Sequence, residues 1–369
     1  MNGEIMKNAL FFCFFLFFAF CPSLRGVEID WNNRFVFYGD NTEFFEPFRT
    51  GETLLGQQGK SFFTAALGSK AFLSAGLFGD FRSVTEPTMT VKPLLSFEYR
   101  EGGSRLVMGT LVTRDRHGFL EPLQVTTLEF TRPVEYGFQW IEEGPSFKCD
   151  LFLNWHQLNT PTEPEAFDYG GTLQQAFGDN FSLEEQLHGF HRGGQLYYAG
   201  VFNNWVPALG FRCRVPGFLG ETRLGVFGVL SATLDKSTSA PTQWGRGGYL
   251  KASVVPGEGF EFFGIGWRGS DLYTQEGDAH YASFSDPDSS TTGEIHGFVR
   301  SDRFYAELGV KKEFQMEGGA SFVAELRSHW IDEWWAYSYR LEVTVPLDIH
   351  LLTLDQFDKE KNNGDSSLP

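Results

Sequence analysis

Long apolar runs, helical periodicity and cysteine are all scarce in this 369-residue sequence. Apart from one run near the N-terminus, no stretch approaches the ~20 apolar residues that a transmembrane helix requires, and the mean hydropathy is -0.23. The formal net charge of -17 excludes an ordinary nucleic-acid-binding protein, which needs clustered Lys and Arg. Only four cysteines are present, too few for a disulfide framework in a chain of this length. These absences exclude a helical membrane protein and a disulfide scaffold.

The one apolar run predicts export. Lys7 precedes an apolar stretch over residues 10–20, and Pro22, Ser23 and Gly26 then break the pattern. A basic start, a short apolar core and a small or polar end are typical of a secretory signal peptide. We therefore expect residues 1–26 to be a signal peptide and the rest of the chain to be exported.

Glycine and aromatic residues are abundant, with 42 Gly, 40 Phe, 12 Tyr and 9 Trp. The segment 337–345 places Tyr, Tyr, Leu, Val and Val on one face and Ser, Arg, Glu and Thr on the other. This strict alternation predicts a strand with one apolar and one polar face. The same pattern recurs around residues 91–100, 134–140, 148–156, 209–215, 306–311 and 322–327.

Two architectures produce such alternation, a soluble β-sandwich and a transmembrane β-barrel. The barrel is favoured by charges of both signs in the middle of the polar faces, by aromatics at segment ends, and by the lack of an amphipathic helix. We predict an all-β fold, a single antiparallel barrel of about 16–18 strands over residues 27–350. The best final strand ends near Val345, and residues 351–369 form a polar tail. A barrel of this size would enclose a water-filled lumen.

Together these features resemble Gram-negative outer-membrane β-barrels of the porin kind. The resemblance is one of pattern over nearly the whole exported chain, with no specific motif. It implies the outer membrane as location and outer-membrane lipid, the barrel-assembly machinery and small hydrophilic solutes as partners, with oligomers possible and no nucleic acid. The C-terminus departs from the pattern, because such barrels usually end on an aromatic residue.

The predicted function is a porin-like channel for diffusion of small hydrophilic solutes, without enzymatic activity. Charged residues on the polar faces and in the loops would line its lumen of mixed charge or its constriction. These candidates are Glu43, Glu46, Arg49, Glu52, Glu98, Arg100, Glu135, Lys148, Asp150, Arg212, Arg214, Glu307, Lys311, Glu325, Arg327, Arg340 and Glu342. The acidic and aromatic segment 40–52 and the segment Arg114–Glu121 are each either a loop folded into the lumen or a solvated turn.

No catalytic, cofactor or metal site follows from the sequence. His188 and His191 would share a face only on a helix, and no third ligand lies near them. There is no Gly-x-Ser-x-Gly motif. Two alternatives stay open: an exported soluble β protein that binds or processes carbohydrate, and an outer-membrane hydrolase. The hydrolase would need a Ser–His pair on neighbouring strands, which the sequence does not identify.

The two cysteines outside the N-terminal segment carry a further expectation. Cys149 and Cys213 both belong to apolar rows of the predicted strands. We therefore expect them to face lipid as unpaired thiols that behave as small hydrophobic residues.

Overall fold

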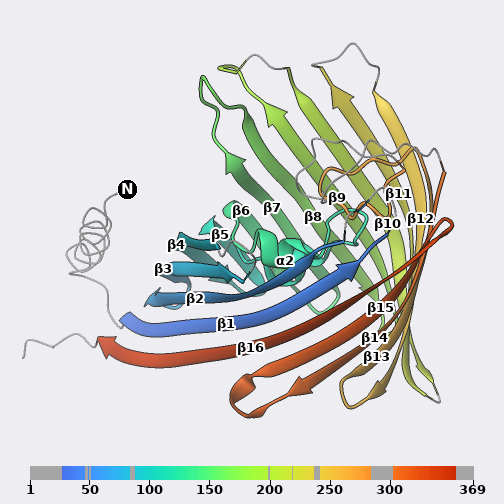
Figure 1. Ribbon diagram of the computed structural model, residues 1–369. Coiled ribbons are helices and arrows are strands. Elements are labelled where there is room, and N and C mark those ends of the chain that lie inside the picture. Colours follow the sequence, from blue (N-terminus) through green and yellow to red (C-terminus); the bar gives the residue numbers. More distant parts are fainter. Residues whose placement is uncertain are drawn as a thin grey trace, which may run out of the picture.

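Sixteen antiparallel strands form one closed barrel in the computed structural model of the protein (Figure 1). The structure describes residues 27–45, 49, 51–83, 88–197, 200–217, 219–236, 242–283 and 302–354. The predicted signal peptide and the end of the predicted tail lie outside these residues. No helix in the described ranges is long and apolar enough to cross a membrane.

The strands follow one another around the barrel in chain order, with two short 3-10 segments and one helical turn between them. The elements are β1 (Val27–Glu43), β2 (Thr53–Leu67), β3 (Ala71–Arg82), β4 (Thr88–Glu101), β5 (Ser104–Thr110), η1 (Arg114–Gly118), α2 (Leu128–Thr131), β6 (Tyr136–Glu143), β7 (Phe147–Gln157), β8 (Glu165–Phe177), β9 (Phe181–Gly193), β10 (Phe202–Gly217), β11 (Gly220–Asp235), β12 (Gln243–Gly257), β13 (Phe260–Ser270), β14 (Asp302–Gln315), η2 (Glu317–Gly319), β15 (Ser321–Ile331) and β16 (Trp334–Leu354).

The first and last strands close the barrel. β1 pairs with β2 on one side and with β16 on the other, in a register that joins Asp40 to Arg340 and Val27 to Leu354. The predicted fold class is therefore confirmed, and the strand number lies at the lower end of the expected range. The expectation that the final strand ends near Val345 is wrong. β16 continues to Leu354 because its second half pairs with the first half of β1.

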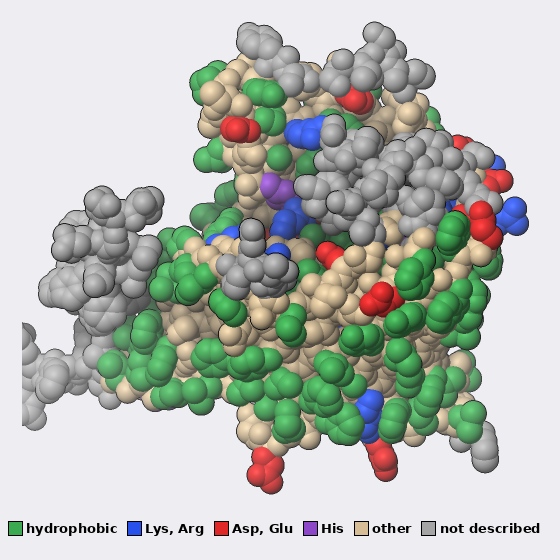
Figure 2. Space-filling view, in the orientation of Figure 1, with side chains coloured by type: hydrophobic (Ala, Val, Ile, Leu, Met, Phe, Trp, Pro, Cys, Tyr) green, Lys and Arg blue, Asp and Glu red, His purple; other side chains and the backbone are tan. Residues whose placement is uncertain are grey.

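Alternate side chains along each strand face opposite sides of the wall, as the sequence pattern predicts. On β16, Tyr339 and Leu341 are 44% and 48% exposed, whereas Ser338 is buried. Figure 2 shows many hydrophobic side chains on the part of the outer wall that is in view. Cys149 on β7 and Cys213 on β10 are both free thiols, as expected, but Cys149 is buried and Cys213 is half-buried.

The two ends of the barrel differ in the length of their connections. At the end where β1 begins and β16 ends, strands are joined by short turns, such as residues 102–103 and 258–259. At the opposite end the connections 111–135 and 271–301 are long. We refer to these as the short-turn end and the long-loop end.

Two segments from the long-loop end cross the interior of the barrel. Residues 111–135 contact strands far apart on the wall: Gln58 on β2 donates to the carbonyl of Phe130, and Gln186 on β9 to the carbonyl of Gly118. Residues 271–283 also lie inside the barrel, where Asn204 on β10 donates a hydrogen bond to the carbonyl of Tyr273. Figure 1 shows α2 inside the barrel. Leu120, Leu123, Leu272 and Tyr281 of these segments are buried against inward-facing wall residues. The lumen is therefore packed with side chains where the segments cross it.

The face assignment predicts how the barrel responds to an added charge. Leu341→Arg would place a guanidinium among lipid chains near the middle of β16, so we expect a cost of about 2–4 kcal/mol in the free energy of unfolding. Leu55 is the control position near the membrane–water interface. It is 49% exposed, as Leu341 is 48% exposed, and it lies close to the long-loop end of β2. Leu55→Arg should cost about 0–1 kcal/mol. Urea unfolding in lipid vesicles measures both, and equal costs would contradict the assignment.

Candidate functional site

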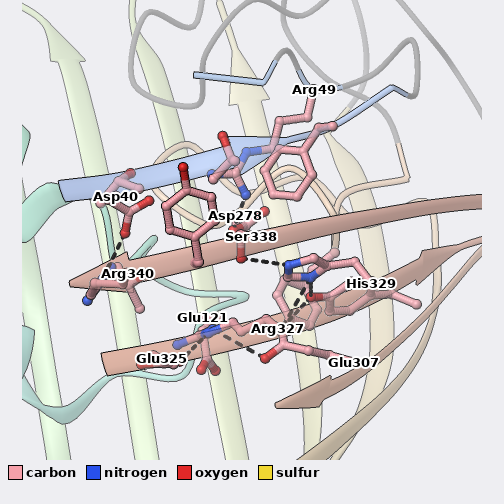
Figure 3. A pocket seen from close by; sticks show the side chains of 17 residues that line it. Asp40, Arg49, Glu121, Asp278, Glu307, Glu325, Arg327, His329, Ser338 and Arg340 are labelled. Carbon is pink, nitrogen blue, oxygen red and sulfur yellow. Dashed lines mark hydrogen bonds and ion pairs between the residues drawn. The ribbon is translucent and has the colours of Figure 1, made fainter. Parts of the chain in front are cut away.

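A cavity lies inside the long-loop end, against β1, β14, β15 and β16 (Figure 3). It holds about 510 Å³ of space free of atoms, part of it open to solvent. Residues of both crossing segments, among them Thr127 and Tyr281, complete its wall. The cavity thus lies where the barrel seam and the two inserted segments meet.

A serine, a histidine and a glutamate lie next to one another in the wall of this pocket. Ser338 Oγ lies 2.9 Å from His329 Nε2. On the other side of the ring, His329 Nδ1 lies 3.5 Å from Glu307 Oε2 and 2.8 Å from the hydroxyl of Tyr305. That hydroxyl also donates a hydrogen bond to Glu307. Figure 3 shows Ser338, His329 and Glu307 pointing toward one another from three strands.

Strand register explains why these three side chains meet. Glu307 on β14 and His329 on β15 are directly paired, so their side chains share a face. His329 pairs with Ala336 on β16, which places Ser338 diagonally across from the ring. All three residues are at most 8% exposed. The constellation is therefore built from the regular wall and not from a mobile loop.

Aromatic rings surround the imidazole and reduce its contact with water. Phe44 meets His329 edge-on with ring centroids 5.3 Å apart, and it meets His280 in the same way at 4.4 Å. His280 stacks on Tyr305 at 5.3 Å. In such a setting, hydrogen bonds and charges act more strongly than in water.

Buried ion pairs hold the pocket walls in place. Arg340 on β16 donates to Asp40 on β1 at 2.7 Å and to Glu129 on α2 at 3.4 Å. Arg49 donates to Asp278 at 2.5 Å, which joins the β1–β2 loop to the second crossing segment. Arg327 contacts both Glu307 and Glu325. Each pocket guanidinium is therefore neutralised by a carboxylate of the wall or of a crossing segment.

A second buried histidine, His117 in η1, has both ring nitrogens occupied. Nε2 lies 2.8 Å from Glu135 and Nδ1 lies 3.1 Å from Asp150, and the ring stacks on Phe152 at 3.9 Å. Burial alone would lower the pKa of His117, but hydrogen bonds to Asp150 and Glu135 and their negative charges raise the pKa to about 9. The imidazole is therefore protonated at neutral pH and is not available as a base.

A third cluster joins His156 and His188 to Asp168, at 2.7 and 3.2 Å. His191, in contrast, contacts Asn203 and not this cluster. No three His, Cys, Asp or Glu side chains in the described ranges are arranged to hold a metal ion.

The lumen candidates from the sequence fall into several groups. Five of them line the pocket: Arg49, Glu307, Glu325, Arg327 and Arg340. Glu135 and Asp150 meet at His117, Arg212 pairs with Glu184, and Glu98 contacts Arg100 and Arg105. The remaining candidates do not line the pocket, and one of them is outside the described residues. Glu43 accepts a hydrogen bond from Asn41, and Glu342 accepts one from Thr344. Three further candidates are exposed, namely Glu52, Lys148 and Arg214, and Lys311 is half-buried. Glu46 is outside the described residues.

Sequence reasoning missed the Ser–His pair, although a local signal for it was present. His329 continues the polar row of Glu325 and Arg327, and Ser338 begins the polar row that contains Arg340. The two rows face each other across the turn at residues 332–333. No such pattern marks Tyr305, Asp278 or Tyr281. Tyr305 is aromatic and does not stand out as a polar residue of its strand. Asp278 and Tyr281 lie in a loop that is distant from this hairpin in the sequence.

The closed sixteen-strand barrel, with lipid-facing apolar rows, defines an outer-membrane β-barrel protein. Within that class, the model of the "Lipid A 3'-O-deacylase-type" family matches residues 27–354, and the chain belongs to this family. The match spans the barrel from the first residue of β1 to the last residue of β16. No curated protein matched the sequence.

Solved structures agree on the fold at low sequence identity. The loop L8 deletion mutant of OmpT from Vibrio cholerae is 10% identical, with a TM-score of 0.55 over 87% of this chain and 99% of that one. The in-vitro folded OmpT, a trimer form, is 9% identical with a TM-score of 0.54 over the same shares. OprD from Pseudomonas aeruginosa is 12% identical, with a TM-score of 0.43 over 90% of this chain and 96% of that one. At these identities the OmpT structures support the barrel fold alone.

The family match corrects one expectation from the sequence. The chain was expected to have no enzymatic activity, but the matched family is a family of deacylases. A local sequence motif could not indicate such an activity, because side chains that meet inside a barrel come from different strands.

The ion pair at the barrel seam makes a stability prediction. Arg340→Leu would leave Asp40 buried without its partner, so we expect a loss of about 3–5 kcal/mol in the free energy of unfolding. Arg214→Leu, at an exposed position of β10, should change it by less than about 0.5 kcal/mol. Urea titrations followed by gel mobility compare the two, and similar values would show that the pair does not stabilise the seam.

The pKa of His117 predicts a pH dependence. Folding raises this pKa from 6.5 to about 9, so the stabilisation is complete below pH 6.5 and is lost as the pH rises through about 9. We expect the unfolding midpoint to fall across this window in the native protein. In His117→Gln the same window should be flatter, and parallel profiles for the two proteins would contradict the assignment.

Proposed function

We propose that the protein is an outer-membrane ester hydrolase that removes an ester-linked acyl chain from a glycolipid of the lipid A class, with Ser338 as the nucleophile. The observation that carries the proposal is that His329 contacts the Ser338 hydroxyl with one ring nitrogen and Tyr305 and Glu307 with the other, in a pocket at one end of the barrel. The name of the matched family supports the substrate class and the 3'-O-ester as the bond cleaved.

The geometry supports a two-step acyl transfer. In the first step Ser338 Oγ attacks the acyl carbonyl carbon while His329 Nε2 takes its proton. The ester bond then breaks, His329 returns the proton to the departing sugar hydroxyl, and the acyl chain remains on Ser338. In the second step His329 takes a proton from water, which attacks the acyl carbonyl. The fatty acid leaves and Ser338 regains its proton.

Tyr305 and Glu307 would hold His329 in the tautomer that this chemistry requires. The Tyr305 hydroxyl can accept from Nδ1–H while it donates to Glu307, so that the lone pair of Nε2 faces Ser338. The carboxylate also favours the imidazolium that forms during each transfer. Arg327, which contacts Glu307, fixes that carboxylate in turn.

The short β15–β16 turn at the long-loop end supports access of a membrane lipid to the pocket. Outer-membrane barrels have short periplasmic turns and longer external loops, which assigns the long-loop end to the cell exterior. There the turn between β15 and β16 is only two residues long, and Trp330, Trp334 and Trp335 are exposed beside it. Such aromatics mark the level of the lipid headgroups. Ser338 lies three residues further along β16 than Trp335, about 10 Å along the strand.

The diffusion channel predicted from the sequence has weaker support. Residues 111–135 and 271–283 cross the lumen and bury apolar side chains within it. A channel would need a continuous hydrophilic path, whereas a hydrolase needs only the pocket and its access from the rim.

The test is the rate of fatty-acid release from lipid A in mixed detergent micelles. Ser338→Ala should lower kcat at least about 10³-fold, since removing a triad nucleophile abolishes acyl transfer. His329→Gln should lower it to a similar level. Ser328→Ala is the matched control on β15, because the Ser328 hydroxyl accepts from Trp335 instead of facing His329. This control should keep full activity.

Two results would contradict the assignment. Full activity of Ser338→Ala, with gel mobility showing a folded barrel, would exclude it as the nucleophile. Loss of activity in His117→Gln combined with full activity in His329→Gln would transfer the role of base to the other buried histidine.

A further inference from the structure

The hydroxyl of Tyr281 is buried in the pocket without a hydrogen-bond partner. Tyr281 is 1% exposed, and its oxygen contacts no donor or acceptor among the described residues. The residue belongs to the second crossing segment and lines the same pocket as Ser338 and His329. A ligand that enters the pocket could therefore supply a partner that the described residues do not.

Close aromatic contacts hold the ring in place. Tyr281 meets Tyr305 edge-on with centroids 4.9 Å apart and Trp267 at 5.4 Å. The Tyr305 hydroxyl in turn contacts His329, so a single ring separates Tyr281 from the proposed base. These contacts fix the phenol before any substrate enters.

The missing partner is costly for the folded protein. A buried hydroxyl without a hydrogen bond destabilises a protein relative to one that has a partner. Phenylalanine would make the same ring contacts without that cost. An unsatisfied buried group inside a candidate active site is therefore better explained by a partner that arrives with the substrate.

We propose that the Tyr281 hydroxyl donates a hydrogen bond to the acyl carbonyl oxygen of the substrate as that oxygen becomes an oxyanion. The inference rests on the proposed function, because it assumes that Ser338 attacks an ester in this pocket. Tyr281 transfers no proton. Its O–H stabilises the negative charge of each tetrahedral intermediate and releases it when the carbonyl forms again.

The electrostatic environment suits a donor of this kind. Burial, with the nearby Tyr305 and Glu121, raises the pKa of the Tyr281 phenol well above 10, so it is protonated at neutral pH. A neutral phenol can donate to an oxyanion without the desolvation cost of a buried cation. The guanidiniums of the pocket are already neutralised by carboxylates.

The experiment compares Tyr281→Phe with Tyr249→Phe in the full-length protein. We expect Tyr281→Phe to lower kcat about 10²–10³-fold with little change in KM, the usual effect of losing one oxyanion donor. Its unfolding midpoint should be unchanged or higher, because no hydrogen bond within the protein is lost. Tyr249, also buried, donates to Glu121 at 2.8 Å, so Tyr249→Phe should lower stability and keep kcat.

A second readout uses a serine-reactive fluorophosphonate, whose phosphoryl oxygen occupies the oxyanion position in the adduct on Ser338. Tyr281→Phe should slow inactivation by about the same factor as kcat. Full activity and native inactivation of Tyr281→Phe would overturn the inference, as would a rise in KM alone or a loss of stability. In those cases an inactive Ser338→Ala would leave the proposed function standing. An active Ser338→Ala would remove both.

Discussion

Backbone pairing between β1 and β16 is the constraint on which the rest of the structure depends. Within a lipid bilayer every strand must find partners on both sides, so the first and last strands have to meet. Their meeting brings Asp40 within 2.7 Å of Arg340, although 300 residues separate them in the sequence. The pocket forms along this seam, because β1 supplies one wall and β14 to β16 supply the other.

The crossing segments convert a wide barrel into a structure with a core. A barrel of sixteen strands would be too wide for wall side chains to fill alone. Residues 111–135 and 271–283 supply the missing volume, and they bury Leu123 and Leu272 completely. The same segments contribute Thr127 and Tyr281 to the pocket. Filling the lumen and shaping the pocket are therefore two consequences of one insertion.

Two buried histidines, His117 and His329, differ in the groups that contact their ring nitrogens. His117 is held between two carboxylates, and neither nitrogen is left for another partner. His329 has a serine hydroxyl on one nitrogen and a carboxylate with a tyrosine hydroxyl on the other. The first arrangement stabilises a fixed charge, whereas the second is the arrangement that the proposed hydrolysis needs for proton transfer between oxygen and nitrogen.

The sequence by itself determined the strands and their faces, because alternation with a period of two reports directly which side chains share a side of the wall. It therefore predicted that Arg340 points inward and Leu341 outward. The sequence also held the local hairpin that brings His329 to Ser338, although the pair was not recognised. Only the tertiary structure decided that residues 111–135 and 271–283 enter the lumen, and that Tyr281 reaches the pocket. These contacts join segments far apart in the chain, which depend on barrel closure and leave no periodic trace in the sequence.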